Sequence, residues 1–207
     1  YPVLYLMDGQ SAFEQQPGVP GEWKADETAT ELINNGEIEP LIIVGVPHAG
    51  QWRMAEYCPL TGVQGVPALG APFVAWLLTE VRPRVERSFR IKSGVENTAI
   101  GGASMGGLIS LYAATRNPDV FGAVLAESPT LILGNKDAVK ELFATPNSWP
   151  RRVYLGVGGR ELTGDERARE ANQRLIEAVK GIDAAAAAAG AAHVVVVEPE
   201  ATHDENA

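Results

Sequence analysis

The chain has 207 residues, 45% of them hydrophobic, and a formal net charge of −9 at pH 7. This length suits one well-packed domain and is too short for two comfortable ones. The acidic balance argues against nucleic acid and anionic membranes as partners, because neutralising phosphate requires clustered Lys and Arg.

The N-terminal part of the chain predicts two strands separated by a helix. Residues 3–7 form an apolar strand, and residues 8–10 after it are a turn signal. Residues 22–32 read as a helix. Residues 40–46 are rich in β-branched side chains and predict a strand that is covered on both faces, with His48 just beyond its end.

The next part predicts an irregular segment followed by a helix. Residues 49–70 carry Arg53 and Glu56, for which we favour surface packing as an ion pair over a role in substrate binding. Apolar residues then recur at helical spacing over residues 73–85, and Pro83 should bend or end that helix.

One serine between glycines lies at the centre of the chain. Residues 97–100 predict a short buried strand, and residues 108–114 predict a helix that stops at Asn117-Pro118. Between them, residues 102–106 fit G-x-S-x-G, the strand-to-helix turn that exposes a nucleophilic serine. The alternative is an ordinary glycine-rich turn, such as a phosphate-binding loop. The position between strand and helix favours the nucleophile, Ser104.

The C-terminal half continues the alternation of strands and helices. Strands are predicted at residues 123–126, 153–157 and 193–198, a helix at residues 165–189, and a mixed insertion at residues 130–150. Such alternation predicts an α/β fold with a mainly parallel sheet and helices on both faces. Binding groups should then lie at the carboxyl ends of the strands.

A serine nucleophile needs a base, and the chain has three histidines. His193 begins a strand and should lie at the opposite edge of the sheet. His48 follows a strand at the correct edge. His203 follows the last strand, and the order serine, acid, histidine in the elbow fold favours it over His48.

The acid that orients the histidine should follow the strand between Ser104 and His203. Glu161 and Asp165 are the candidates there. Residues 163–166 fit a capping box, which gives Asp165 a structural role in the first turn of a helix, so we favour Glu161. Asp204 and Glu205 could substitute for it.

An acyl-transfer serine also needs hydrogen-bond donors for the oxyanion. These donors are normally the backbone N–H after the nucleophile and one N–H from the loop after an earlier strand. Met105 and Gln10 occupy these positions, and both would act through the backbone.

Motifs along nearly the whole chain resemble the putative esterase (esterase D-like) family of α/β-hydrolases, which includes feruloyl and acetylxylan esterases, siderophore esterases and the antigen 85 mycolyltransferases. The matching stretches are Tyr5-Leu6-Met7-Asp8-Gly9, Arg53 to Tyr57 with Pro59, Gly102 to Leu108, Phe121-Gly122, Ser128-Pro129, Val153-Tyr154-Leu155 with Gly158 and Glu161, and His203-Asp204-Glu205. The resemblance implies an α/β-hydrolase domain over residues 1–207. It also implies one or two strands before Tyr1 and a helix after His203, which this sequence lacks.

By this resemblance Ser104 is the nucleophile, His203 the base, Glu161 the acid, and Gln10 and Met105 the oxyanion donors. The expected activity is that of a serine carboxylesterase acting on a small, carbohydrate or aromatic-acid ester. An acyltransferase of the same fold and a non-catalytic binding module are the alternatives.

The pocket walls should come from residues 11–23, 48–70 and 129–150. Candidate substrate contacts are His48, Trp23, Trp52 and Arg53, and Trp149 could also stack on a ligand, although tryptophans in loops more often simply pack.

We expect a small-molecule ester as the partner and no cofactor or metal. The single cysteine, Cys58, excludes an internal disulfide and a cysteine zinc cluster. No apolar run approaches the length of a membrane span, which predicts a soluble protein, either cytoplasmic or secreted. Its compartment and oligomeric state stay open.

Overall fold

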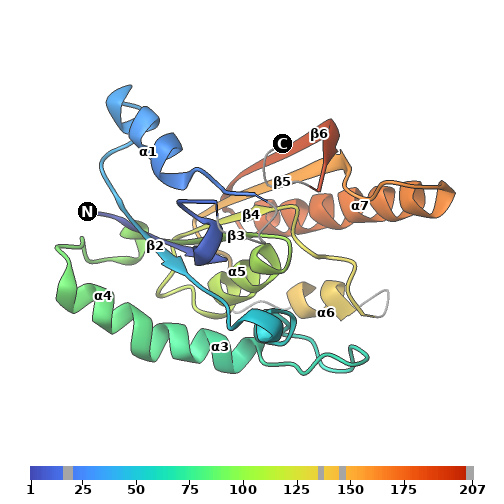
Figure 1. The fold of residues 1–207 in the computed structure, drawn as a ribbon, viewed down its shortest axis with the longest axis horizontal. Coiled ribbons are helices and arrows are strands. Elements are labelled where there is room, and N and C mark those ends of the chain that lie inside the picture. Colours follow the sequence, from blue (N-terminus) through green and yellow to red (C-terminus); the bar gives the residue numbers. More distant parts are fainter. Residues whose placement is uncertain (16–20, 135–137, 145–147, 204–207) are drawn as a thin grey trace.

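The computed structural model describes residues 1–15, 21–134, 138–144 and 148–203, and one parallel sheet runs through it (Figure 1). The sheet has six strands in the order β2-β1-β3-β4-β5-β6, and all five strand pairs are parallel. The strands are β1 (Val3–Met7), β2 (Ile42–Val46), β3 (Thr98–Ala103), β4 (Ala123–Glu127), β5 (Arg152–Arg160) and β6 (Ala192–Thr202). Because all strands point the same way, their carboxyl ends meet at one edge.

Helices connect successive strands. They are α1 (Ala25–Asn34), α2 (Arg53–Glu56), α3 (Gly70–Trp76), α4 (Arg82–Ser88), α5 (Met105–Arg116), α6 (Ala138–Ala144) and α7 (Glu166–Ala188), with 3-10 turns η1 (Gly9–Ser11), η2 (Gly50–Trp52) and η4 (Val95–Asn97). Figure 1 shows α1 on one side of the sheet and α3, α4 and α5 on the other. The predicted α/β class, with helices on both faces, is confirmed.

The core lies between the sheet and helices α5 and α7. Helix α5 is buried almost throughout, because Leu108, Ile109 and Leu111 of this helix are inaccessible to solvent. Helix α7 instead shows one buried stripe, which includes Leu175 and Val179, and packs on β5 and β6. A fully covered α5 fixes the segment that begins directly after Ser104.

The helix predicted over residues 73–85 is three consecutive segments. A π-helical segment, η3 (Leu77–Val81), separates α3 from α4, and Pro83 lies in the first turn of α4. Proline lacks an N–H and its ring displaces the carbonyl four residues earlier, so the wider π turn before Pro83 accommodates it. The predicted bend is therefore a local change of helix type.

Several boundaries differ from the sequence prediction. Helix α1 begins at Ala25, because Lys24 before it has a left-handed backbone with φ of 50°. The irregular residues 49–70 contain η2 and α2. Asp165, predicted in the first turn of the next helix, is instead the N-cap of α7, and its side chain accepts the Arg167 N–H at 3.0 Å.

Among the described residues, no helix is long and apolar enough to cross a membrane.

Candidate active site

Ser104 lies on a strained turn between β3 and α5. Its backbone has φ of 56° and ψ of −122°, a conformation that non-glycine residues rarely adopt. The backbone N–H of Ser104 donates to the carbonyl of Glu127 at 2.9 Å, and its carbonyl accepts the Leu108 N–H at 3.1 Å. The turn thus has the strand-to-helix geometry that the G-x-S-x-G pattern predicts.

The glycines beside Ser104 are required by close packing. A Cβ on Gly102 would lie 2.6 Å from the backbone carbonyl carbon of Gly106, and a Cβ on Gly106 would lie 2.8 Å from Asp8 Oδ2. Both distances are shorter than real Cβ contacts allow. Strand β3, helix α5 and the end of β1 therefore approach one another only because these positions lack side chains.

Four neighbouring strands place polar residues at the same edge of the sheet. Ser104 follows β3, Ser128 follows β4, Glu161 follows β5 and His203 follows β6. A cavity of about 880 Å³ opens there, lined by Asp8, Gln10, Ser11, Trp23, His48, Arg53, Ala103, Ser104, Leu125, Glu127, Ser128, Tyr154, Gly156, Val157, Gly158, Glu198, Ala201, Thr202 and His203. The candidate nucleophile and candidate base therefore share one cavity.

Glu161 is a buried carboxylate with strong hydrogen-bond donors. It is 5% exposed, its Oε2 lies 2.5 Å from His203 Nδ1, and its Oε1 accepts the Gly158 N–H at 2.6 Å and the Ser128 hydroxyl. Burial alone would raise the pKa of Glu161, but the hydrogen bonds from His203, Ser128 and Gly158 outweigh it and lower this pKa. The carboxylate is thus held in its ionised form beside the imidazole.

The other two histidines lie in different environments. His48 lines the same cavity, but its Nε2 is 3.9 Å from Asp8 Oδ1, and its buried Nδ1 has no hydrogen-bond partner among the described residues. His193 lies at the start of β6, at the opposite edge of the sheet, with Nδ1 2.6 Å from Asp183 Oδ1. His203 is the histidine that the structure brings together with a candidate acid.

Of the remaining candidate acids, Asp165 is the one that lies among the described residues. Asp165 caps helix α7, as described above, and this accounts for its side chain. Asp204 and Glu205 lie outside the described residues.

The two candidate oxyanion donors, Gln10 and Met105, lie just after the ends of β1 and β3. Met105 is the first residue of α5, and the first N–H groups of a helix have no intrahelical carbonyl to donate to. Gln10 is the middle residue of η1 and lines the cavity. Both residues would donate through their backbone N–H groups, so their proposed role as oxyanion donors does not depend on their side chains.

Arg53 forms an ion pair with Asp8, whereas the sequence suggested Glu56 as its partner. Arg53 Nε and Nη2 donate to the two Asp8 oxygens at 2.6 and 2.8 Å, and Glu56 accepts the Ala49 N–H at 2.8 Å. Asp8 is buried, and its N–H donates to the hydroxyl of Tyr57 at 3.0 Å. A guanidinium group that donates two hydrogen bonds stabilises a buried carboxylate more than an exposed carboxylate, because the buried one has lost its water. The ion pair therefore links the turn after β1 to the start of helix α2.

Three side chains on the strand ends were missed as functional residues by sequence reasoning. Ser128 donates to Glu161, Thr130 Oγ1 lies 3.3 Å from Ser104 Oγ, and Asp8 holds Arg53. For Ser128 and Asp8 the sequence offered two signals, their position after a strand at the carboxyl edge and their place in stretches that resemble the esterase family, but neither signal gave them a role.

The candidate substrate contacts divide into two groups. Trp23, His48 and Arg53 line the cavity. Trp52 is 51% exposed and is not part of the cavity lining, and Trp149 packs on Phe143 with ring centroids 6.4 Å apart.

The pKa of Glu127, one of the carboxylates that line the cavity, is shifted in the opposite direction from that of Glu161. Burial is the main cause that raises the pKa of Glu127, nearby Glu198 and Glu161 add to it, and a hydrogen bond from Tyr154 partly offsets it. Burial and the proximity of Glu127 in turn raise the pKa of Tyr154 to about 12. This side of the cavity is acidic.

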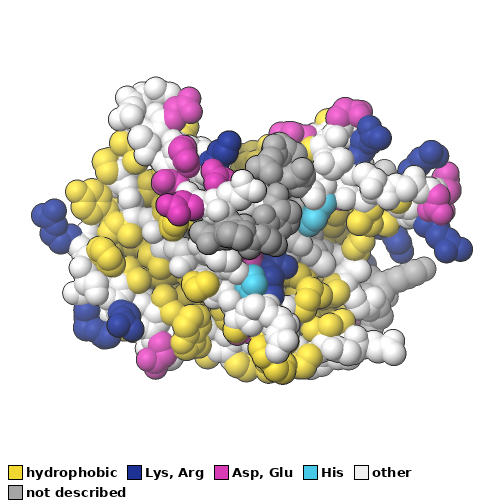
Figure 2. All heavy atoms as spheres, in the orientation of Figure 1, with side chains coloured by type: hydrophobic (Ala, Val, Ile, Leu, Met, Phe, Trp, Pro, Cys, Tyr) yellow, Lys and Arg dark blue, Asp and Glu magenta, His cyan; other side chains and the backbone are white. Residues whose placement is uncertain are grey.

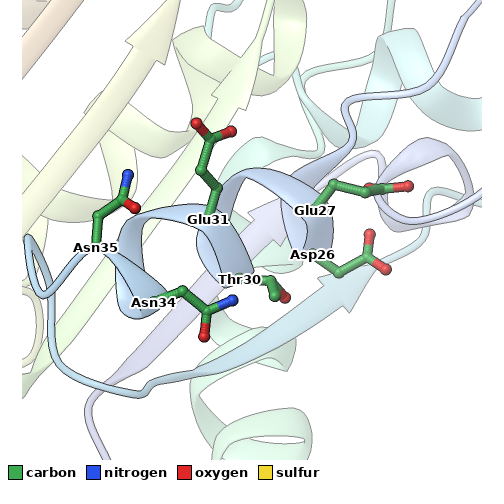
Figure 3. Close-up of a pocket in the computed structure, with 6 residues that line it drawn as sticks. All are labelled: Asp26, Glu27, Thr30, Glu31, Asn34 and Asn35. Carbon is green, nitrogen blue, oxygen red and sulfur yellow. The ribbon is translucent and has the colours of Figure 1, made fainter.

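The molecular surface shows the same acidic character elsewhere. Figure 2 shows acidic side chains gathered over α1 and histidine side chains nearer the centre of the same face. A second hollow of about 510 Å³ runs along α1, lined by Asp26, Glu27, Thr30, Glu31, Asn34 and Asn35 (Figure 3). It has neither histidine nor serine in its lining and lies on a single helix.

No group of three His, Cys, Asp or Glu side chains among the described residues is arranged to hold a metal ion.

Comparison with known proteins places the chain among esterases. The family model described as "Putative esterase" matches residues 1–207. An endo-1,4-beta-xylanase/feruloyl esterase of Xylanibacter ruminicola is 29% identical over 123 residues, which cover 59% of this chain and 16% of that protein. An iron(III) salmochelin esterase of Escherichia coli is 27% identical over 189 residues, covering 85% and 43% of the two chains.

The solved structures agree with the fold. The siderophore hydrolase EstA of Aspergillus nidulans superposes with a TM-score of 0.70 at 21% identity, over 98% of this chain and 76% of that one. The sequence described here thus spans less than half the length of the two curated relatives above.

Proposed function

The chain belongs to the putative esterase family, and within it we propose a serine carboxylesterase that works through an acyl-enzyme on Ser104. One observation carries the proposal. The Glu161–His203 pair and the strained Ser104 turn lie at the ends of neighbouring parallel strands, and Ser104 and His203 line one cavity. This is the residue set that serine acyl transfer requires.

The reaction begins with attack of Ser104 Oγ on the ester carbonyl carbon. His203 Nδ1 is engaged by Glu161, so Nε2 takes the hydroxyl proton. The N–H groups of Gln10 and Met105 stabilise the negative charge on the former carbonyl oxygen. When the bond between carbonyl carbon and alcohol oxygen breaks, the alcohol leaves with the proton from His203.

Water completes the cycle. It gives a proton to His203 Nε2 and attacks the acyl carbon, and the Ser104 ester bond breaks as His203 returns the proton to Oγ. Glu161 stays ionised throughout, which agrees with the lowered pKa that its three donors cause. Its negative charge stabilises the imidazolium that forms in each half of the reaction.

The substrate class follows from the relatives. Two curated relatives are named as a feruloyl esterase and an iron(III) salmochelin esterase, and a third is a siderophore triacetylfusarinine C esterase of Aspergillus fumigatus. We therefore propose a small ester of an aromatic acid, a carbohydrate or a siderophore. Parallel assays with feruloyl, acetyl-sugar and catecholate-lactone esters would separate these.

The test uses wild type and Ser104→Ala. A fluorophosphonate probe should label the wild type at Ser104, and the variant should lose labelling and p-nitrophenyl acetate turnover. Retained turnover in the variant would refute the proposal. Ligand binding without labelling of the wild type would indicate a binding module. Transfer of the acyl group to an added alcohol in preference to water would indicate an acyltransferase.

A further inference from the structure

Residues 128–130, which follow β4, contact both ends of the proposed proton relay. The Ser128 hydroxyl donates to Glu161 Oε1, and the Thr130 hydroxyl lies within hydrogen-bond distance of Ser104 Oγ, 3.3 Å away. We propose that Ser128 and Thr130 are positioning residues: Ser128 holds the acid and Thr130 holds the nucleophile. This inference rests on the proposed function for its kinetic part.

The backbone around this segment, called here the 128–130 segment, is fixed from two sides. Thr130 N–H donates to the Ser104 carbonyl at 3.0 Å, and Ser104 N–H donates to the Glu127 carbonyl at 2.9 Å. On the other side, Ser128 N–H donates to the Gly156 carbonyl of β5 at 2.8 Å. The segment therefore joins the elbow to the strand that carries Glu161.

Ser128 has a strained backbone. Its φ is 41°, in the left-handed region that glycine and asparagine prefer. Strain of this kind persists where surrounding contacts enforce it, and it is common at functional sites. Here the strained backbone aims the hydroxyl at the carboxylate.

The effect of Ser128 on the pKa of Glu161 depends on the other charged and polar groups around this carboxylate. Among the described residues, Glu127 at the end of β4 is a further titratable group close to Glu161, and its raised pKa partly reflects Glu161. On the side of α7, neutral Asn172 accepts the Leu162 N–H at 2.8 Å and donates to its carbonyl. The compensating donors to Glu161 are thus Ser128, the Gly158 N–H and His203.

Removing the Ser128 hydroxyl should shift a pH profile as well as lower a rate. With one donor fewer, the Glu161 carboxylate becomes more basic, so the Glu161–His203 pair holds its proton to higher pH. The acid limb of kcat/KM for p-nitrophenyl acetate should move up by about 0.5 to 1 pH unit. The titration midpoint of the His203 imidazole, followed by NMR, should move in the same direction.

Two Ser128 variants guard against a folding defect. Ser128→Ala removes the hydroxyl, and Ser128→Gly removes it while relieving the left-handed strain. Both should show the same shift. Ser110→Ala is the matched control, because the buried Ser110 hydroxyl in α5 has no hydrogen-bond partner among the described residues, and its profile should match wild type.

Removing the Thr130 hydroxyl should affect the labelling rate of Ser104 and not the pH profile. Thr130→Val keeps the shape and removes the hydroxyl, so fluorophosphonate labelling of Ser104 should slow about tenfold with no shift of the acid limb. Thr130→Ser should restore the labelling rate to within about twofold.

The outcomes separate this inference from the proposed function. An acid limb and His203 midpoint at wild-type pH in both Ser128 variants, or labelling of Thr130→Val at the wild-type rate, overturns it. An unlabelled, inactive wild type refutes the esterase proposal and with it the role of Thr130. The NMR midpoint still decides the role of Ser128 in that case, because it needs no turnover.

Discussion

At the scale of single residues, two carboxylates that both follow β5, Glu161 and Asp165, have different environments. Glu161 is buried and accepts three hydrogen bonds, one of them from His203. Asp165 caps α7 through the Arg167 N–H. Only the first is placed to hold the tautomer and orientation of the proposed base.

Substituting these two carboxylates tests that distinction. Glu161→Gln keeps the shape but loses the charge that stabilises imidazolium, so kcat should fall by about 10²- to 10⁴-fold. Asp165→Asn is the matched control, since asparagine is an equally good N-cap and the activity should stay within about twofold of wild type. Steady-state kinetics with p-nitrophenyl acetate measures both. The reverse ranking would assign the acid to Asp165.

The partner of Arg53 shows what a sequence cannot supply. Its spacing to Glu56 suggested a local pair, while the structure pairs it with Asp8, 45 positions earlier in the chain. Asp8 is buried just after the end of β1, and a buried carboxylate needs a charged partner more than an exposed one does. Only tertiary packing decides that competition.

At the scale of elements, most strands and helices could be predicted because their hydrophobic patterns are strong. Strand β1 begins and ends as predicted, and the elbow strand and α5 flank Ser104 as expected. The π segment before Pro83 could not be predicted. The sequence shows that a proline disturbs the helix, but it does not show whether the helix responds by ending, by bending or by forming a π turn.

The junction of β3 with α5 makes a sharp element-scale prediction. Gly102→Ala would force a Cβ to within 2.6 Å of the Gly106 backbone, so the free energy of unfolding should fall by several kcal/mol, about 2 to 5 by analogy with severe overpacking and strain. Gly181→Ala in α7 is the matched control. Apart from the adjoining backbone of the helix itself, no atom of the described residues lies within 4 Å of a Cβ there, so helix propensity alone should stabilise the protein by about 0.5 to 1 kcal/mol.

Urea denaturation of the two glycine variants provides the measurement. If Gly102→Ala unfolds at the wild-type urea concentration, the close approach of β3 and α5 in the elbow is wrong. If Gly181→Ala is destabilising, a contact of α7 has been overlooked.

At the scale of the whole molecule, charge should influence which esters reach the site. The net charge is −9, and the cavity lining includes the carboxylates Asp8, Glu127 and Glu198, with Arg53 as the one Lys or Arg side chain among the described lining residues. A negative field raises the local concentration of cations and repels anions, and added salt screens it.

This field predicts a salt effect on substrate preference. The kcat/KM ratio of an acetate ester with a quaternary ammonium group to its uncharged isostere should fall about threefold or more between about 10 mM and 0.5 M salt. Stopped-flow or steady-state assays of both esters give this ratio. A ratio that does not change with salt would show that the acidic cavity wall does not act on the incoming ester.

The central claim concerns one covalent bond. Wild-type protein mixed with p-nitrophenyl acetate, quenched in acid within the first turnovers and digested should give, by mass spectrometry, an acetyl group on the peptide that contains Ser104 and on that residue. His203→Ala should accumulate far less of it, because the serine then lacks its base. An acetyl group on another residue, or its absence from wild type during turnover, would contradict the account.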